Sequence, residues 1–503
     1  MNDTRGPTDE LSASPYPIRG TDTGQQAVIH PPTSRQLPSI AHEVDTRKDV
    51  AHVNSNHTSE EPSEEHNLAL RNQSMAQQSS ELRELVGLQL THTTGFVVPL
   101  RIYEQQTMAS GNLMQLQCWA KLLNLAVVKP FTKDSSFSIP LDETTHSTML
   151  TLADTFDMDD WSQHTAKLGY APLVDWSYFV QKAPRNAIFV QIKYPTLTHV
   201  RTVRSQGHPF PHPPNGDDYK QGCRFKMLTG KISNVLKAMS FRVVRKVCFN
   251  FLTGSELSLK QFHADILGGY QPGDVTIFID EWRGIKENQR VLIQDNICRE
   301  ENPYREYLKP SQHLLRDAQL YAKQFLETFS NKTTANPDYL AIIARYEMTG
   351  LTRSLNIDND QHAIIPHCLQ LTLQTMEKVR QETGLTDTFL SIDIGKYGSK
   401  SFEQKNYYNH LKDMESFVGK VYNGRMDVHG WEKTFETVAH TTDAGYIAML
   451  QQVLVVRAKC IIFVGGGSFQ RHAFHLYNEL HPNKEDRCYK VIEKCTTPYR
   501  PIK

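Results

Sequence analysis

The chain has 503 residues, enough for two or three domains with a large apolar core. Lysine plus arginine and aspartate plus glutamate each total 55, so the formal net charge is zero. This balance argues against a nucleic-acid-binding protein that works through bulk electrostatic attraction. No stretch is long and apolar enough to span a bilayer, and the first residues do not form a signal peptide.

Residues 1–80 are rich in Ser, Thr, Pro, Gln, Asn, His and Glu and contain almost no aromatic residues. Such a segment cannot bury enough apolar surface to offset the entropy of ordering. We therefore predict a disordered tail or stem at 1–80, with the folded part beginning near Glu81.

The first folded segments alternate between strand and helix. A strand is predicted at 95–101, a helix with one apolar face at 105–125, and a second strand at 125–130. Further apolar runs predict strands at 186–192, 245–251 and 275–279. This β-α-β order predicts a parallel sheet with helices on its faces.

The second half repeats this order after a polar, proline-containing hinge at 300–310. Ser311 is the predicted N-cap of a helix that runs to about residue 329. Later apolar runs predict strands at 339–344, 388–393 and 460–464, with helices at 367–383 and 443–457. The predicted fold is α/β, with two Rossmann-like parallel-sheet domains that face a cleft. The predicted boundaries are 1–80 for the tail, 81–305 for the N-terminal domain and 306–503 for the C-terminal domain.

The segment at 460–472 contains a glycine turn with the sequence Gly465-Gly466-Gly467. It follows a buried strand, and Ser468 is the predicted N-cap of the helix that comes next. Glycines let the backbone approach a guest closely, and the free N–H groups of a helix start favour anions. The turn therefore predicts an anion-binding site, and the alternative is a tight turn that holds nothing.

Polar residues follow the predicted strands of the second half at their carboxyl ends, where open parallel sheets bind ligands. They are Arg345, Asp393 and Ser468. An arginine can bind two phosphate oxygens at once, so this set is typical of a nucleotide diphosphate site. The alternative for Arg345 is an ion pair with a carboxylate such as Glu347.

In the first half, Gly111 and Asn112 fall early in the predicted helix, where backbone N–H groups are expected to be free. A second anion-binding feature like the glycine turn is the functional interpretation, and a loosely capped helix start is the alternative. No metal-ligand motif occurs, and the D-x-D sequences at 157–160 and 358–360 do not follow an apolar strand, so they are interpreted as turns or caps.

None of the eight cysteines forms a C-x-x-C pair, which argues against a zinc ribbon or a thioredoxin-like site. Cys118, Cys248 and Cys460 lie in apolar runs and are predicted to be plain core residues. Cys488 and Cys495 are close enough in sequence to be bridged in an oxidising compartment.

Four of these segments together resemble motifs of the GDP-fucose protein O-fucosyltransferase superfamily. Residues 339–348 resemble its signature strand, and Arg-Tyr-Glu-Met at 345–348 resembles the sequence of the plant-type branch at this position. Residues 389–398 resemble the second motif, 443–469 the third, and 105–130 the donor-facing turn and helix. The resemblance runs in the same order along residues 95–480.

The resemblance implies a GT-B glycosyltransferase that moves fucose from GDP-fucose to a protein Ser/Thr hydroxyl or to a glycan. Such enzymes invert the anomeric carbon and use no metal or other cofactor. Arg345 would hold the β-phosphate and Asn112 would lie near fucose or acceptor, which makes these two the catalytic candidates. The residues assigned to GDP-fucose are Gly111, Asn112, Arg345, Asp393, Gly465, Gly467, Ser468 and Phe469.

The chain departs from the family pattern at Ile343, which stands where relatives have histidine. A catalytically inactive binding relative is therefore one alternative, and an unrelated nucleotide-sugar enzyme is another. The general base stays open among Glu104, Asp157 and Glu347.

The implied partners are GDP-fucose and an acceptor protein or glycan, with no nucleic acid. The resemblance implies the ER or Golgi lumen, with membrane attachment through an anchor that is not visible in this sequence. A cytoplasmic location is the alternative.

Overall fold

The structure is a computed structural model. It describes residues 93–102, 106–139, 149–193, 231–250, 256–283, 292–294, 308–330, 338–345, 357–392, 411–424 and 428–492, with Cys223, Phe225, Cys298 and Met426. The predicted disordered segment 1–80 lies outside these residues. Glu65–Lys503 form one compact unit. The domain boundaries at 80 and 305 stay predictions.

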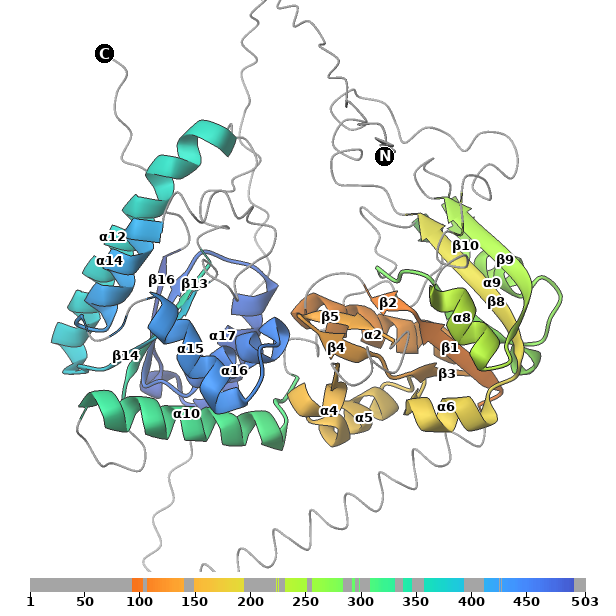
Figure 1. Ribbon diagram of the computed structural model, residues 1–503, viewed down its shortest axis with the longest axis horizontal. Helices are drawn as coiled ribbons and strands as arrows, with labels where there is room; N and C mark the ends of the chain where they lie inside the picture. Colours follow the sequence, from red (N-terminus) through yellow and green to blue (C-terminus); the bar gives the residue numbers. More distant parts are fainter. Residues whose placement is uncertain are drawn as a thin grey trace, which may run out of the picture. The chain divides into compact units, whose positions relative to one another are not determined.

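The N-terminal half forms a six-stranded sheet in which every strand pairing is parallel (Figure 1). Its order is β7-β3-β1-β11-β8-β9. The strands are β1 (Gly95–Pro99), β3 (Leu125–Val128), β7 (Leu173–Val174), β8 (Asn186–Lys193), β9 (Arg242–Asn250) and β11 (Thr276–Ile279). All strands predicted here from apolar runs are confirmed.

Alternate residues of each strand point to opposite faces of this sheet, as the pleat requires. Phe96 and Val98 of β1 pack in one apolar cluster, whereas Val97 packs in another. The first cluster contains residues of α6 (Trp176–Lys182) and α8 (Lys231–Ala238). The second contains residues of α2 (Gln106–Lys121) and α9 (Leu259–Leu267), and it continues into the C-terminal half.

The C-terminal half contains a separate parallel sheet with the order β14-β13-β15-β16. Its strands are β13 (Leu340–Ala344), β14 (Thr388–Ile392), β15 (Cys460–Val464) and β16 (Cys488–Ile492). Because β13, β14 and β15 are wholly buried, they read as continuous apolar runs rather than alternating ones. The predicted α/β class with two Rossmann-like parallel sheets is confirmed.

Six helices accompany this sheet within the described residues: α10 (Gln312–Ser330), α12 (Ile357–Thr383), α14 (Leu411–Val421), α15 (Val428–Ala439), α16 (Ala444–Val456) and α17 (Ser468–Leu480). From β13 the chain connects to β14, which neighbours β13 on one side. It then connects to β15, which neighbours β13 on the other side. Right-handed crossovers in opposite directions place α12 and α16 on opposite faces of the sheet. The predicted cap of α10 is confirmed, because Leu314 N–H donates to the Ser311 hydroxyl at 3.0 Å.

A small antiparallel sheet with the order β2-β5-β4-β6 was not predicted. Its turn at Asp134 joins the C-terminal half, because Asp134 N–H donates to Asp443 Oδ2 at 2.7 Å and Ala444 N–H donates to Asp134 Oδ1 at 3.3 Å.

The remaining elements are β2 (Arg101–Ile102), β4 (Phe131–Lys133), β5 (Ser136–Ser138), β6 (Leu150–Thr151), α4 (Leu152–Thr155), α5 (Met158–Lys167), β10 (Glu256–Ser258), η4 (Pro272–Asp274), β12 (Leu292–Gln294) and η6 (Lys484–Asp486).

The predictions of plain core cysteines and of a Cys488–Cys495 bridge are wrong. Cys118 bonds to Cys298, Cys223 to Cys248 and Cys460 to Cys488, and Cys368 is also disulfide-bonded. Cys118, Cys248 and Cys460 are buried as expected, but each is bonded to a cysteine that lies between 25 and 180 residues away along the chain. The suggested Cys488–Cys495 pair is excluded by the bond between Cys460 and Cys488, which are opposite each other on adjacent strands.

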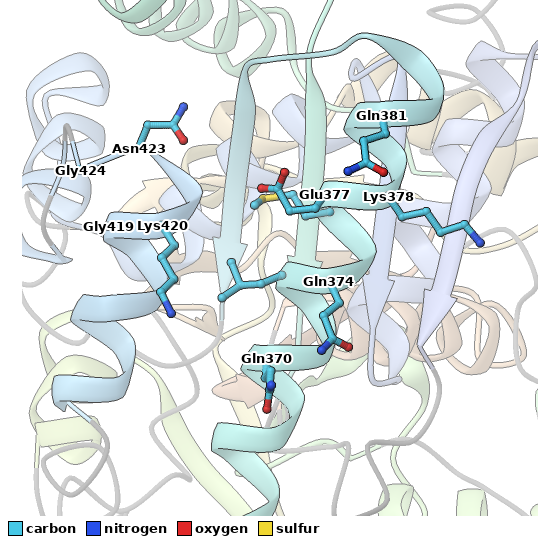
Figure 2. A pocket seen from close by; sticks show the side chains of 11 residues that line it. Gln370, Gln374, Glu377, Lys378, Gln381, Gly419, Lys420, Asn423 and Gly424 are labelled. Carbon is cyan, nitrogen blue, oxygen red and sulfur yellow. The ribbon is translucent and has the colours of Figure 1, made fainter.

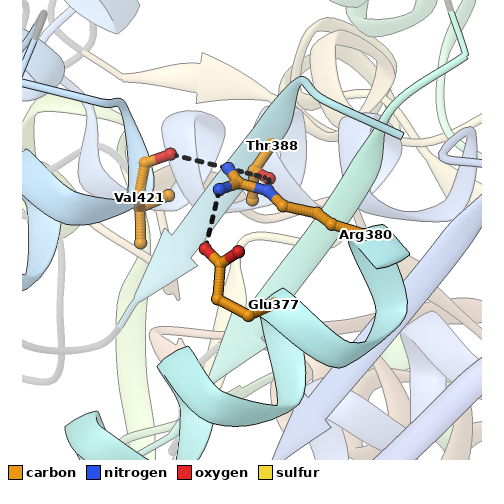
Figure 3. A network of polar contacts seen from close by, with 4 residues as sticks. All are labelled: Glu377, Arg380, Thr388 and Val421. Carbon is orange, nitrogen blue, oxygen red and sulfur yellow. Dashed lines mark hydrogen bonds and ion pairs between the residues drawn. The ribbon is translucent and has the colours of Figure 1, made fainter. Parts of the chain in front are cut away.

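Arg380 joins three elements at the amino edge of the C-terminal sheet (Figure 3). Its guanidinium donates from Nη2 to the Thr388 hydroxyl at 2.8 Å and to the Val421 carbonyl at 3.0 Å. Nη1 binds the Glu377 carboxylate at 3.1 Å. The arginine side chain is only 12 % exposed, so it connects α12 to the first residue of β14 and to the end of α14.

We expect Arg380→Met to lower the free energy of unfolding by about 2–3 kcal/mol, because hydrogen bonds to a charged donor are lost and a buried carbonyl loses that donor. Lys378→Met is the matched control on the same helix. Lys378 is exposed and has a single ion pair of 3.9 Å, so its loss should cost less than about 0.5 kcal/mol. Urea unfolding of both variants measures the difference, and equal costs would contradict the role given to Arg380.

Candidate active site

The site candidate with the most sequence-predicted residues lies at the carboxyl edge of the C-terminal sheet. Strands β13 and β15 end in register, with Ala344 opposite Val464. Chain connections leave this pair in opposite directions, which is the point where doubly wound sheets bind ligands. The next residue of β13 is the half-buried Arg345, whose N–H donates to the Val464 carbonyl at 2.8 Å.

The glycine turn lies directly beside Arg345. Gly465 has φ +86° and Gly467 has φ +119° with ψ 174°, conformations that are essentially restricted to glycine. A Cβ on Gly467 would lie 3.8 Å from Nη1 of Arg345. The structure thus places a guanidinium next to the start of α17, where backbone N–H groups have no partner within the helix. Both features favour a bound anion.

The predicted N-cap is wrong by one residue. Gly467 is the N-cap of α17, and Ser468 is the first residue of the helix. A serine hydroxyl suits an N-cap, but the φ of Gly467 already turns the chain into the helix. Phe469, which is half-buried, follows in the same first turn. The structure therefore brings Arg345, Gly465, Gly467 and the backbone of 468–469 close together.

We expect Gly467→Ala to lower stability by about 1–3 kcal/mol and to weaken anion binding, because alanine rarely adopts this conformation. Gly466→Ala is the matched control from the same turn. Its φ is not in the left-handed range, and a Cβ there would meet no atom within 4 Å. Thermal unfolding and calorimetric titration with GDP test both variants. A Gly466→Ala variant that loses as much as Gly467→Ala would contradict this account.

Buried amide side chains hold the turn in place. Gln470 Nε2 donates to the carbonyls of Val464 at 2.5 Å and Ile343 at 3.2 Å, the ends of β15 and β13. Gln452 of α16 donates to the Phe469 carbonyl at 2.7 Å. These residues were not identified from the sequence. A signal existed, because Gln451 and Gln452 interrupt an otherwise apolar helix, and buried polar residues are informative.

His472 supports the same turn from the core. Its Nδ1 lies 2.6 Å from Gln452 Oε1, and its Nε2 lies 3.2 Å from the Leu308 carbonyl, just before α10. Burial lowers the pKa of His472 to about 4, so the ring is neutral at physiological pH. It therefore contributes packing and hydrogen bonding rather than charge to the site.

The structure corrects the interpretation of Gly111 and Asn112. They are the sixth and seventh residues of α2, beyond the first turn, so their N–H groups are not the free donors that were expected. The Asn112 side chain is buried, and its backbone carbonyl accepts a hydrogen bond of 2.9 Å from Trp282 Nε1. Helix α17, which begins at the glycine turn, contacts α2. A contact of Asn112 with substrate stays a prediction.

The structure describes only some of the other residues that were singled out in the sequence. Asp393, Glu104 and Glu347 lie outside the described residues. Asp157 is the N-cap of α5, and its carboxylate accepts hydrogen bonds from two backbone N–H groups, as its interpretation as a cap predicts. Ile343 is 1 % exposed and lies in the apolar core.

A groove of about 1070 Å³ lies elsewhere, along α12 and α14 (Figure 2). It is near Arg380 and therefore toward the amino edge of the sheet, opposite to Arg345. Open α/β sheets bind ligands at the carboxyl edge, so we place the candidate site there and not in this groove.

Two searches over the described parts of the chain gave negative results. No group of three or more His, Cys, Asp or Glu side chains in those parts is arranged to hold a metal ion. No described helix combines the length and the apolar character needed to cross a membrane.

Comparison with known proteins found structural similarity without sequence similarity. No protein-family model matches the chain, and no curated protein matches its sequence. Crystal structures of POFUT1 align with this chain: the apo form with TM-score 0.41, over 79 % of this chain and 98 % of that one. The complex with GDP-fucose aligns with TM-score 0.41 over 80 % and 98 %, and the complex with GDP with TM-score 0.40 over 79 % and 99 %. Sequence identity is 11 % in each alignment.

Proposed function

We propose that this protein is an inverting, metal-independent fucosyltransferase that uses GDP-fucose as donor and a protein hydroxyl or a glycan as acceptor. The observation that carries the proposal is the position of Arg345 beside the glycine turn, where the chain connections leave β13 and β15 in opposite directions. The resemblance of these same segments to fucosyltransferase motifs supports it.

The chemistry follows from where charge develops. When the bond between fucose and the β-phosphate breaks, negative charge grows on the departing GDP. Arg345 and the N–H groups at the start of α17 are fixed before the reaction, so they can stabilise that charge without reorganising. Mutations of single donors of this kind in enzymes typically cost about 3–4 kcal/mol of transition-state stabilisation.

A non-catalytic GDP-fucose-binding relative is the second candidate, and Ile343 favours it. The buried isoleucine cannot supply the hydrogen bond that a histidine would offer at that position. Such a relative would keep Arg345 and the glycine turn and bind donor without turning it over.

We also propose that the protein works in the ER or Golgi lumen. Three disulfides among the described residues support this location, because disulfides persist in oxidising compartments and are rare in reducing ones. The proposed plant-type assignment within the superfamily rests only on the Arg-Tyr-Glu-Met sequence at residues 345–348.

Calorimetric titration of the full chain with GDP, GDP-fucose and UDP in EDTA tests the donor proposal. We expect GDP and GDP-fucose to bind and UDP to bind more weakly. Binding followed by release of GDP from GDP-fucose would identify the enzyme, and binding without release would identify the non-catalytic relative. A folded protein that binds neither guanine nucleotide would exclude both.

A further inference from the structure

Asp280 occupies the position in the N-terminal sheet that corresponds to Arg345 in the other sheet. It is the first residue after β11, at the carboxyl edge. Strand β11 lies between β1 and β8, and the chain leaves β1 toward β3 but leaves β8 toward β9. The connections thus diverge around β11, and a crevice at such a point is the usual ligand site of an open α/β sheet.

The Asp280 carboxylate is held in one orientation. Gln191, on the neighbouring strand β8, donates from Nε2 to Asp280 Oδ2 at 3.0 Å. The other end of the same amide accepts a hydrogen bond from Phe225 N–H, also at 3.0 Å, so the amide cannot turn around without losing both contacts. Within the described ranges, Oδ1 of Asp280 accepts no hydrogen bond. The carboxylate therefore presents one oxygen that can receive a proton.

Contacts connect this position to the candidate site. Trp282, two residues beyond Asp280, donates from its ring to the Asn112 carbonyl on α2 at 2.9 Å. Its backbone N–H donates to the Arg101 carbonyl at 2.9 Å, which fixes the residues after β11 against β2. Helix α2 in turn contacts α17, the helix that begins at the glycine turn.

The charges around Asp280 suit a proton acceptor. Burial raises the pKa of its carboxyl, and the negative charge of Glu281 raises it further. The hydrogen bond from Gln191 and the positive charge of Arg101 act in the opposite direction. Glu281 is itself paired with Arg283. A carboxylate whose pKa is raised above the ordinary value is a stronger base.

We propose that Asp280 is the general base that accepts the proton of the attacking hydroxyl group, an inference that rests on the proposed function. In this step the bond between the anomeric carbon of fucose and the β-phosphate oxygen breaks, and its electron pair leaves with GDP. A bond forms from the acceptor oxygen to the anomeric carbon. The hydroxyl proton moves to Oδ1 of Asp280, so charge and atoms balance. None of the three other candidates, Glu104, Asp157 and Glu347, is needed for this role.

The test uses GDP-fucose alone, with water as the acceptor, because the natural acceptor is unidentified. GDP release is measured against pH for the wild type and for Asp280→Asn. We expect Asn at this position to lower the turnover rate about 10²- to 10³-fold. Since the base must be ionised, the wild-type rate falls as pH drops through the Asp280 pKa, and this fall should disappear in the variant. Calorimetric affinity for GDP-fucose should stay unchanged, which also shows that the variant is folded.

Glu281→Gln is the matched control, with the adjacent carboxylate removed. We expect it to keep the maximal rate and to move the acid limb to lower pH, because a charge that raises the Asp280 pKa is gone. The inference is overturned if Asp280→Asn keeps the turnover rate within a factor of about three, or if the wild type binds GDP-fucose without releasing GDP. A wild type that does not bind GDP-fucose overturns the proposed function itself.

Discussion

Arg345→Ala is expected to weaken the binding of GDP and GDP-fucose by about 30-fold or more. Arg345 is the side chain that the structure places beside the glycine turn, and a diphosphate bound there would lose its principal cation. Removing one partner of a buried, hydrogen-bonded charge pair costs about 2–5 kcal/mol, which corresponds to roughly 30- to several-thousand-fold in affinity. Calorimetric titration with each nucleotide measures the loss directly.

Two further variants sharpen this test. Arg345→Lys keeps the positive charge but lacks the planar guanidinium that can bind two phosphate oxygens at once. It should therefore recover only part of the affinity that Arg345→Ala loses. Arg457→Ala removes an exposed arginine that precedes β15, at the opposite edge of the same sheet, and should leave binding unchanged. If Arg345→Ala binds GDP like the wild type, the nucleotide site is not at the β13–β15 edge.

Much of this site could be predicted because buried parallel strands leave a clear pattern. Strands β13 and β15 are uninterrupted apolar runs, and a polar residue at the end of such a run must lie at the carboxyl edge of the sheet. That rule identifies Arg345 and the glycine turn from the amino-acid sequence alone. Applied to the predicted strand at 275–279, the same rule also points to Asp280, which the motif resemblance did not include.

Other features depend on contacts between residues far apart in the sequence. Strands of two or three residues, such as β2 and β6, are too short to show a period, so the small antiparallel sheet had no local signal. Gln470 stands where a dinucleotide motif has its last glycine, yet its amide bridges two strand ends that are brought together only by folding. Its role depends on tertiary geometry and could not be predicted from local sequence.

The disulfides show the same limit most plainly, because an apolar run containing a cysteine is compatible with either a core thiol or a bridge. Cys118 and Cys298 are both buried, 180 residues apart, and join α2 to the segment after β12. Gln115 of the same helix donates to the Cys298 carbonyl at 2.8 Å, a second contact between α2 and Cys298. Connectivity of this kind cannot be deduced from spacing.

Removing this bridge is expected to have a large effect on stability. In the chain-entropy account, a disulfide that closes a loop of 180 residues stabilises the fold by about 5 kcal/mol, through its restriction of the unfolded chain. The double variant Cys118→Ala/Cys298→Ala should therefore lose about that much free energy of unfolding in guanidinium denaturation. Alanine suits the helical position of Cys118 and leaves no polar atom unpaired in the core.

The bridge between Cys460 and Cys488 provides the comparison, since it closes only 28 residues and joins strands that already pair side by side. The same relation gives about 3.6 kcal/mol for its removal, so Cys460→Ala/Cys488→Ala should be the more stable of the two double variants. The reverse order would mean that packing at the amino ends of β15 and β16, the edge opposite to the glycine turn, depends on the bond itself. Because the bond lies at that opposite edge, GDP titration of the folded variant should show unchanged affinity in either case.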